Sequence, residues 1–268
     1  MFKILVPTDF SAHAHNALAY AIDLANAVNG SIEVLHIYQV YSTTGMFVSV
    51  ASHLERDAQT DMDALLQKFR PRLQPTAQLS GKILKGDAIP MICSHATATN
   101  VDLIVMGTQG ATGLKEIFIG SVTNGVLKQT RIPVLAIPKD GSYQSLKSIV
   151  LAVDDNAIEH KETIGVLLQL SKALSAHLLI FHQDDGDDDL GVHGHLHNHL
   201  AGVEHSFHFE LNRNAISESI RDFAATKNAG MLAMIRRKRG LWEGLFHVSA
   251  TTREVFETEI PLLVLNEV

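Results

Sequence analysis

Cysteine and long apolar runs are scarce in this sequence. Its 268 residues include a single cysteine, Cys93, so no disulfide can form within the chain and a reducing compartment is favoured. No apolar run reaches the ~18 residues that a membrane-spanning helix needs. The first ten residues, MFKILVPTDF, enter a strand pattern directly and do not resemble a secretory leader. We therefore expect a cytoplasmic protein that has no membrane segment.

Positive charge is also in short supply. The formal net charge is −7, with 22 Lys and Arg against 29 Asp and Glu, and no basic patch is evident. Nucleic-acid binding needs clustered Lys and Arg opposite the phosphates, so we expect no nucleic-acid partner. The one basic run, at 236–239, has two interpretations: a solvated loop, or an arm that contacts an anion in a neighbouring site.

The sequence does contain a regular alternation of apolar strand-like runs and helical patterns. With 46% hydrophobic residues and this length, two globular domains can each bury a core. In the first half, strands are predicted at 2–8, 32–38, 78–84, 102–106 and 134–137, and helices at 12–28, 51–69, 88–98 and 121–129. Strands that alternate with helices predict an α/β fold with a parallel sheet covered on both faces.

Glycine gathers in the stretch 105–138. Gly107, Gly110 and Gly113 follow an apolar strand, and Gly120-Ser121 precedes a helix. Glycines let backbone N–H groups approach a ligand, and the N-terminus of a helix attracts anions, so the stretch suits a phosphate cradle. Glycines also serve simply to make turns, and the stretch alone does not decide between the two.

The end of the first strand is the natural neighbour of this cradle. Ligands of parallel sheets bind beyond the carboxyl ends of the strands, which places Pro7, Thr8 and Asp9 beside the 107–121 stretch. Asp9 is therefore a candidate to accept a hydrogen bond from a ligand amine or hydroxyl. The alternative is a carboxylate that caps the following helix or holds the loop.

Three separated segments resemble the universal stress protein family, in its nucleotide-binding branch. They are ILVPTDFS at 4–11, VLHIY at 34–38, and MGTQG at 106–110 followed after nine residues by GSVT at 120–123. The family pattern of Gly, two residues, Gly, nine residues, Gly and Ser or Thr is kept. The resemblance implies a Rossmann-like, adenine nucleotide alpha hydrolase-like fold that binds ATP (or AMP or ADP) with Mg²⁺ or Mn²⁺.

The same resemblance assigns residues to parts of the nucleotide. It implies that Asp9 and the backbone at Ile37 hold the adenine, that Met106, Gly107, Gln109 and Gly110 line the ribose and phosphate loop, and that Gly120, Ser121, Val122 and Thr123 hold the phosphates. The loop lacks a lysine placed like that of a Walker A motif, so we expect any phosphoryl transfer to be slow.

The second half repeats the first in degenerate form. Residues 149–154 echo 4–9, and residues 260–265 echo 132–137. Between these anchors we predict helices at 158–175, 215–227 and 249–257, and strands at 177–182, 206–209 and 231–235. The prediction is two tandem five-stranded parallel sheets flanked by helices, in domains 1–139 and 147–268 joined by the polar segment 140–142.

Bulky residues replace the cradle glycines of the second domain. Ile235 and Lys238 stand where Gly107 and Gly110 stood, and Val248-Ser249 replaces Gly120-Ser121. We therefore expect the second domain to bind no nucleotide and to serve a structural role. The family resemblance also implies that the two domains pair through their last strands, 134–137 and 262–265, and it allows paired chains to form a homodimer.

An insert at 184–208 of the second domain is rich in aspartate and histidine. Imidazole and carboxylate are ligands of Zn²⁺, Ni²⁺ and Cu²⁺, and the spacing permits shared metal binding on a helix or on an extended strand. The alternative is a hydrophilic surface loop. The candidate metal ligands are His193, His195, His197 and His199.

Three functions follow from these observations. The leading hypothesis is a non-enzymatic, adenine-nucleotide-binding protein with a regulatory role in stress response. The second is a slow ATPase or an autophosphorylating enzyme that modifies Ser121 or Thr123. The third is a metal-binding stress module, of zinc type, that acts through the histidine-rich insert.

Overall fold

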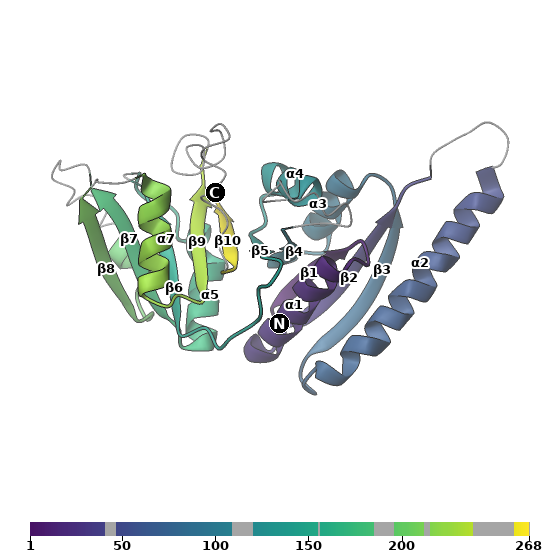
Figure 1. Cartoon of the computed structure of the whole chain (residues 1–268), viewed down its shortest axis with the longest axis horizontal. Helices are drawn as coiled ribbons and strands as arrows, with labels where there is room; N and C mark the ends of the chain where they lie inside the picture. The colour runs from purple at the N-terminus through teal and green to yellow at the C-terminus, as the bar shows by residue number, and fades with distance from the viewer. Residues whose placement is uncertain are drawn as a thin grey trace. The chain divides into compact units, whose positions relative to one another are not determined.

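The computed structural model of this chain describes residues 1–40, 47–108, 120–154, 156–184, 196–211, 215–237 and 260–267. The chain divides into two compact units, residues 1–143 and 144–268 (Figure 1). The predicted domain limits, 139 and 147, lie on either side of this division. The predicted pairing of the two last strands stays a prediction.

The first unit is built on a parallel sheet. Its strands are β1 (Lys3–Thr8), β2 (Ser31–Tyr38), β3 (Gln78–Lys85), β4 (Leu103–Gly107) and β5 (Val134–Ile137), in the order β3-β2-β1-β4-β5. The apolar runs predicted β1 and β4 well because both faces of these central strands are buried, and Leu5 and Ile104 are 0% exposed. The direction of the connections reverses between β1 and β4, where the carboxyl ends of parallel strands leave a crevice for a ligand.

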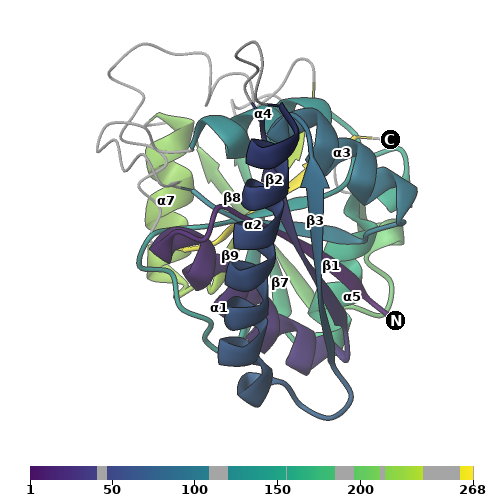
Figure 2. The ribbon, with the colours of Figure 1, turned by 90° about the vertical axis from the view of Figure 1, so that its right-hand side faces the viewer.

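Helices cover both faces of this sheet. They are α1 (Ala12–Val28), α2 (Phe47–Phe69) with the short 3-10 turn η1 (Arg70–Arg72), α3 (Ala88–Ala98) and α4 (Ser121–Gln129). α1 and α2 lie on one face, and α3 and α4 on the other (Figures 1 and 2). α1 begins where the Ser11 hydroxyl accepts the Ala14 N–H and ends at Asn29, which is in the left-handed conformation.

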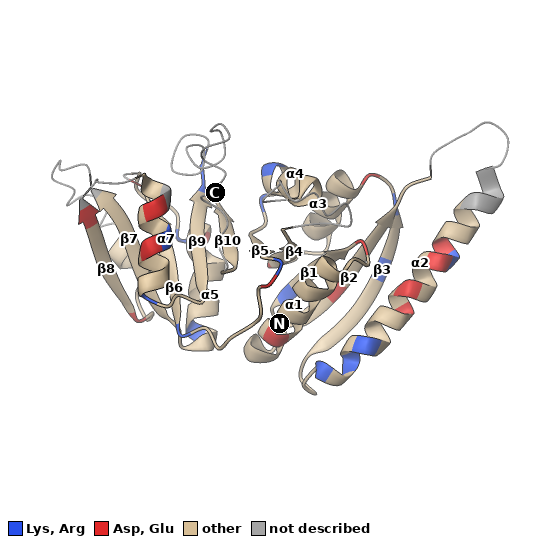
Figure 3. Cartoon of the chain, viewed as in Figure 1, with Lys and Arg blue, Asp and Glu red and all other residues tan. Residues whose placement is uncertain are grey.

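α2 is an amphipathic helix. Met62, Leu65 and Phe69 are buried, whereas acidic residues lie along the middle of the helix together with Arg56, and Lys68 lies in its last turn (Figure 3). Gly81 of β3 allows this helix close to the sheet, because a Cβ there would lie 2.7 Å from the Cγ of Met62.

The second unit repeats the architecture. Its elements are β6 (Ser148–Val153), η2 (Lys161–Ile164), α5 (Gly165–Leu174), β7 (His177–Asp184), β8 (His205–Leu211), α7 (Ile216–Thr226), β9 (Met231–Arg236) and β10 (Leu262–Asn266). The described strands are parallel, in the order β10-β9-β6-β7-β8. The predicted α/β fold is confirmed. The predicted helix at 158–175 forms as η2 and α5, and the one at 249–257 lies outside the described residues.

No helix among the described segments has both the length and the apolar character to cross a bilayer.

A buried tyrosine offers a test of packing in the first unit. Tyr20 is 2% exposed, its ring meets that of Tyr143 edge-on at 5.3 Å, and its hydroxyl has no hydrogen-bond partner among the described residues. A buried polar group without a partner costs about 1–3 kcal/mol, so Tyr20→Phe should raise the free energy of unfolding by about 1 kcal/mol. Urea denaturation at pH 7 measures this, and a clear loss of stability would show that the hydroxyl is satisfied.

The same variant should change the response to alkali. Burial, with a smaller effect of Tyr143, raises the pKa of Tyr20, whereas an unfolded tyrosine ionises near pH 10. The unfolded chain therefore loses this proton first, and the stability that is present below about pH 10 is lost as the pH rises above it. The free energy of unfolding of Tyr20→Phe should decline less between pH 9 and pH 11.

Candidate functional site

The carboxyl ends of β1 and β4 and the start of α4 meet at one edge of the first sheet. The strands are parallel neighbours, so Pro7 and Thr8 at the end of β1 lie next to Met106 and Gly107 at the end of β4. The N–H of Thr108 donates to the Ile137 carbonyl at 2.9 Å, and the N–H of Gly120 donates to the Thr108 carbonyl. These two bonds bring the ends of β4 and β5 to the start of α4.

The N-terminus of α4 presents backbone donors. Its N-cap is Gly120, with φ −51° and ψ 150°, and among the described residues no side-chain capping bond is made to the start of this helix. The Gly120 carbonyl accepts the Asn124 N–H at 2.9 Å, which leaves the N–H groups of the preceding turn at the positive end of the helix dipole. Ser121 and Val122 are exposed, so an anion can reach this turn.

Thr123 is buried, unlike Ser121 and Val122, with which it was predicted to bind the phosphates. It is 4% exposed, and its hydroxyl donates to the Gly107 carbonyl at 2.8 Å. The bond joins the first turn of α4 to the end of β4. Thr123 therefore fixes the position of the helix N-terminus, and its hydroxyl proton is committed within the chain.

Asp9 lies on a tight turn between β1 and α1. It is exposed, and its Oδ1 accepts the Ser11 N–H at 3.0 Å, as in the loop role considered from the sequence. Phe10 has φ +60°, a left-handed conformation that is unusual for an aromatic residue, and its N–H donates to the Thr8 hydroxyl at 3.0 Å. The turn holds the carboxylate at the carboxyl edge of the sheet.

His36 of β2 belongs to this edge and was not identified from the sequence. Its Nδ1 donates to the Thr8 carbonyl at 2.9 Å, and its ring lies 4.4 Å from the ring of Phe10. The half-buried Ile37 follows it and pairs with Leu84 of β3. A sequence signal existed, because the second half places His182 in the same register, with its Nδ1 3.3 Å from the Val153 carbonyl.

Asn16 of α1 was also missed. Its Nδ2 lies 3.3, 3.2 and 2.8 Å from the carbonyls of Pro138, Lys139 and Gly141, respectively. A single amide thereby secures the segment that leaves β5 against the first helix. Nothing local in the sequence distinguishes this asparagine from an exposed helix residue, because its partners are more than 120 residues away.

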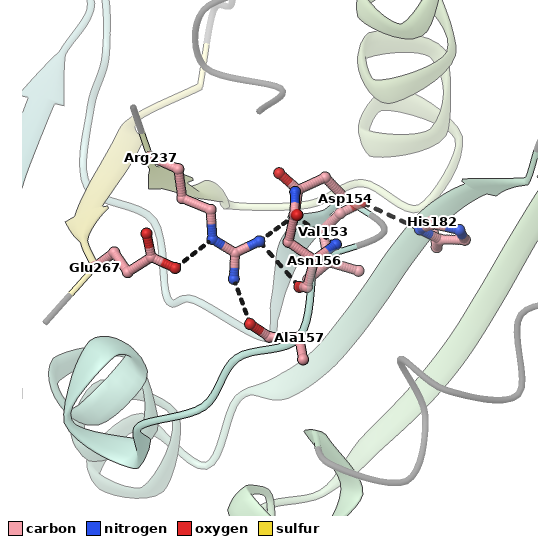
Figure 4. A network of polar contacts seen from close by, with 7 residues as sticks. All are labelled: Val153, Asp154, Asn156, Ala157, His182, Arg237 and Glu267. Atoms are coloured by element: carbon pink, nitrogen blue, oxygen red, sulfur yellow. Dashed lines mark hydrogen bonds and ion pairs between the residues drawn. The ribbon is translucent and has the colours of Figure 1, made fainter. Parts of the chain in front are cut away.

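The equivalent edge of the second unit is filled by an arginine. Asp154 follows β6 as Asp9 follows β1, and the strand registers place Arg237 at the position of Gln109. The Arg237 side chain is 5% exposed and forms ion pairs with Asp154 and with Glu267, the latter at 2.9 Å (Figure 4). Its guanidinium also donates to the carbonyls of Asn156 at 2.9 Å and Ala157 at 3.0 Å.

This network corrects the sequence interpretation of the basic run 236–239. Arg237 is neither part of a solvated loop nor an arm towards another site, because it is buried against carboxylates of its own unit. Arg236 donates from Nε to the Asn266 amide oxygen at 2.7 Å. The other two residues of the run lie outside the described part of the chain.

Several predicted ligands fall on residues that the structure does not describe. Gln109 and Gly110 of the cradle are among them, as are His193 and His195 of the insert. Of the other two insert histidines, His197 is exposed and His199 donates from Nε2 to the Ile158 carbonyl at 2.9 Å. Within the described ranges, no three potential metal-ligating side chains gather at one point. The metal site in the insert stays a prediction.

Comparison with known proteins finds one family repeatedly. Residues 1–138 match the model of the universal stress protein family. Universal stress protein MJ0531 of Methanocaldococcus jannaschii is 29% identical over 142 residues, which are 51% of this chain and 82% of that protein. Universal stress protein YxiE of Bacillus subtilis is 28% identical over 144 residues, 50% of this chain and 97% of its own length.

A solved structure matches nearly the whole chain. The crystal structure of a universal stress protein from Archaeoglobus fulgidus aligns with 99% of this chain and 96% of that one, with a TM-score of 0.74 and 22% identity. At this identity the match concerns the fold alone, and it extends over both units.

Proposed function

We propose, because this chain belongs to the universal stress protein family, that its first unit binds an adenine nucleotide in a non-enzymatic, regulatory role in the stress response. The observation that carries the proposal is the start of α4, where a glycine N-cap leaves the first backbone donors open beside Gly107. Such a turn suits phosphate oxygens, and a Cβ-free residue allows their close approach.

Different residues would bind the phosphates and the adenine. The N–H groups at Ser121 and Val122 would bind the phosphates of a nucleotide complexed with Mg²⁺ or Mn²⁺, while Thr123 keeps the helix in place. Asp9 and the backbone at Ile37 would hold the adenine of ATP, ADP or AMP. The exposure of Asp9 and its place on a fixed turn agree with this role.

The second unit is proposed to be a structural partner. Asp154 is the counterpart of Asp9, but Arg237 already binds it and also donates to two backbone carbonyls and to Glu267. A guanidinium therefore occupies the position where a ligand would be recognised. We infer one nucleotide per chain.

An autophosphorylating enzyme is the second candidate, and the structure separates its two possible acceptors. Thr123 is buried and its hydroxyl donates to a backbone carbonyl, so it is a poor nucleophile. Ser121 is exposed at the anion-binding turn and would be the modified residue. Incubation with labelled ATP, followed by peptide mapping, distinguishes a labelled Ser121 from simple binding.

Isothermal titration of ATP with Mg²⁺ tests the main proposal, after denaturation and chromatography to detect any copurified nucleotide. We expect one site per chain. Asp9→Asn should weaken binding, whereas its counterpart Asp154→Asn should leave the affinity unchanged. Absence of nucleotide in both assays would overturn the proposal, and an effect of Asp154→Asn would show a second site.

A further inference from the structure

A cluster of polar side chains lies on the outer strand of the second unit, away from the edge described above. The Ser206 hydroxyl of β8 is 2.9 Å from Nε2 of His177 and 2.9 Å from Nε2 of His208. Glu204 is close behind, with its Oε1 3.5 Å from Nδ1 of His177. A carboxylate, an imidazole and a hydroxyl thus follow one another, with a second imidazole beyond.

The Glu204 carboxylate is 80% exposed and 3.5 Å from Nδ1 of His177, an ion-pair distance that is longer than a normal hydrogen bond. With the proton of a neutral His177 on Nδ1, Nε2 has a lone pair that accepts the Ser206 O–H. A hydroxyl has only one proton, so the contact with His208 must be an Nε2–H that donates to the serine oxygen. The base that would remove the serine proton is therefore already bonded to it, and the second histidine faces the charge that would develop on the oxygen.

An open cavity adjoins this cluster through His208. Its volume is about 480 Å³, and its lining includes Phe223, Lys227, Glu210 and Asp222. The Phe223 ring is 5.0 Å from that of His208, on the face of β8 that carries Ser206, and suits an acyl or aryl group, while the lysine offsets part of the negative charge. Burial, followed by Lys227 and His177, lowers the pKa of His208, which favours its neutral imidazole.

We propose that Ser206 is a nucleophilic serine that takes an acyl group from small activated carboxylic esters. The oxygen of Ser206 attacks the ester carbonyl carbon while its proton passes to Nε2 of His177. The bond from that carbon to the leaving oxygen then breaks, and His177 returns the proton to the leaving alcohol. Water repeats the same steps on the acyl-serine and releases the carboxylic acid.

The internal repeat supplies a matched control. The strand registers place Ser80 of β3 at the position of Ser206, with Ser31 and Lys82 in place of the two histidines. The Ser80 hydroxyl lies 3.4 Å from the Ile32 carbonyl. The same position in the other unit therefore carries a serine with no histidine at either of the two matching positions.

Labelling with a fluorophosphonate probe tests the proposal on the whole chain. Its phosphorus–fluorine bond breaks as an activated serine oxygen bonds to phosphorus, and mass spectrometry of peptides locates the adduct. We expect one adduct at Ser206, no adduct there in Ser206→Ala, and normal labelling in Ser80→Ala. His177→Gln should slow labelling by ~100-fold, the lower end of what a general base contributes.

A hydroxyl that merely joins β7 to β8 would behave differently. It would leave the folded protein unlabelled at Ser206, and this result, or equal labelling in His177→Gln, overturns the proposal. Thermal unfolding of each variant shows whether it is folded.

Discussion

Gly120→Asp should abolish nucleotide binding while leaving the first unit as stable as before, or slightly more stable. Aspartate is a better N-cap than glycine by a few tenths of a kcal/mol, and its charge complements the helix dipole by about 0.3–1 kcal/mol. The backbone at φ −51° and ψ 150° accepts any residue without strain. The same carboxylate would stand where the phosphates bind, and repulsion of about 2–4 kcal/mol would weaken binding by roughly 30- to 1000-fold.

Gly120→Asn is the matched control for charge. Asparagine has nearly the same shape and caps the helix equally well, but it repels no phosphate. The Kd of Gly120→Asn for ATP should therefore be roughly tenfold lower than that of Gly120→Asp. Titration with ATP and Mg²⁺ measures the affinities, and urea denaturation measures the stabilities. If folded Gly120→Asp binds ATP as the wild type does, the phosphates do not lie at α4.

The two variants test phosphate binding without changing the contacts that position α4, because different residues carry these two roles. Gly120 is the N-cap of α4, and the Thr123 hydroxyl bonds the first turn of this helix to the Gly107 carbonyl. Loss of the threonine bond would move the helix, whereas a charge at Gly120 changes only what the helix N-terminus attracts. Sequence alone gave both residues the same role as phosphate ligands.

The parts of the fold that follow from local sequence were predictable. The apolar runs predicted β1, β4 and β9 because buried parallel strands need apolar residues on both faces, and Asn29-Gly30 predicted the end of α1. The start of α2 was predicted four residues late, at 51 in place of Phe47, since the preceding loop and the first turn have similar composition.

The parts that depend on distant partners were not predictable. Arg237 lies in a run of four basic residues, which locally indicates solvent, but its partners Asp154 and Glu267 are 83 and 30 residues away. His36 resembles any polar residue at the end of a strand until its register partner Thr8 is known. The glycines thus predicted where β4 ends and α4 begins, whereas the contacts made by pairing between strands could not be predicted.

Arg237→Ala should be among the most destabilising single changes in the second unit. The guanidinium is 5% exposed and bonds to Asp154, Glu267 and two backbone carbonyls (Figure 4). Its removal leaves the 14%-exposed carboxylate of Asp154 without its buried cation, and breaking a buried pair in this way costs about 3–5 kcal/mol. Urea denaturation, followed by amide exchange in β6 and β9, assigns the loss to the second unit.

Three further variants determine what the arginine contributes. Arg237→Lys keeps the charge but cannot reach both carboxylates and both carbonyls, so its stability should lie between those of the wild type and Arg237→Ala. The double variant Arg237→Ala with Asp154→Asn should recover part of the loss, because no buried charge is left unpaired. Arg221→Ala, whose ion pair with Asp222 is exposed and 3.8 Å long, should cost under about 1 kcal/mol. If Arg237→Ala lowers the free energy of unfolding as little as Arg221→Ala does, the network does not stabilise this unit. If Arg237→Ala binds a second nucleotide, the arginine excludes the ligand from the second unit.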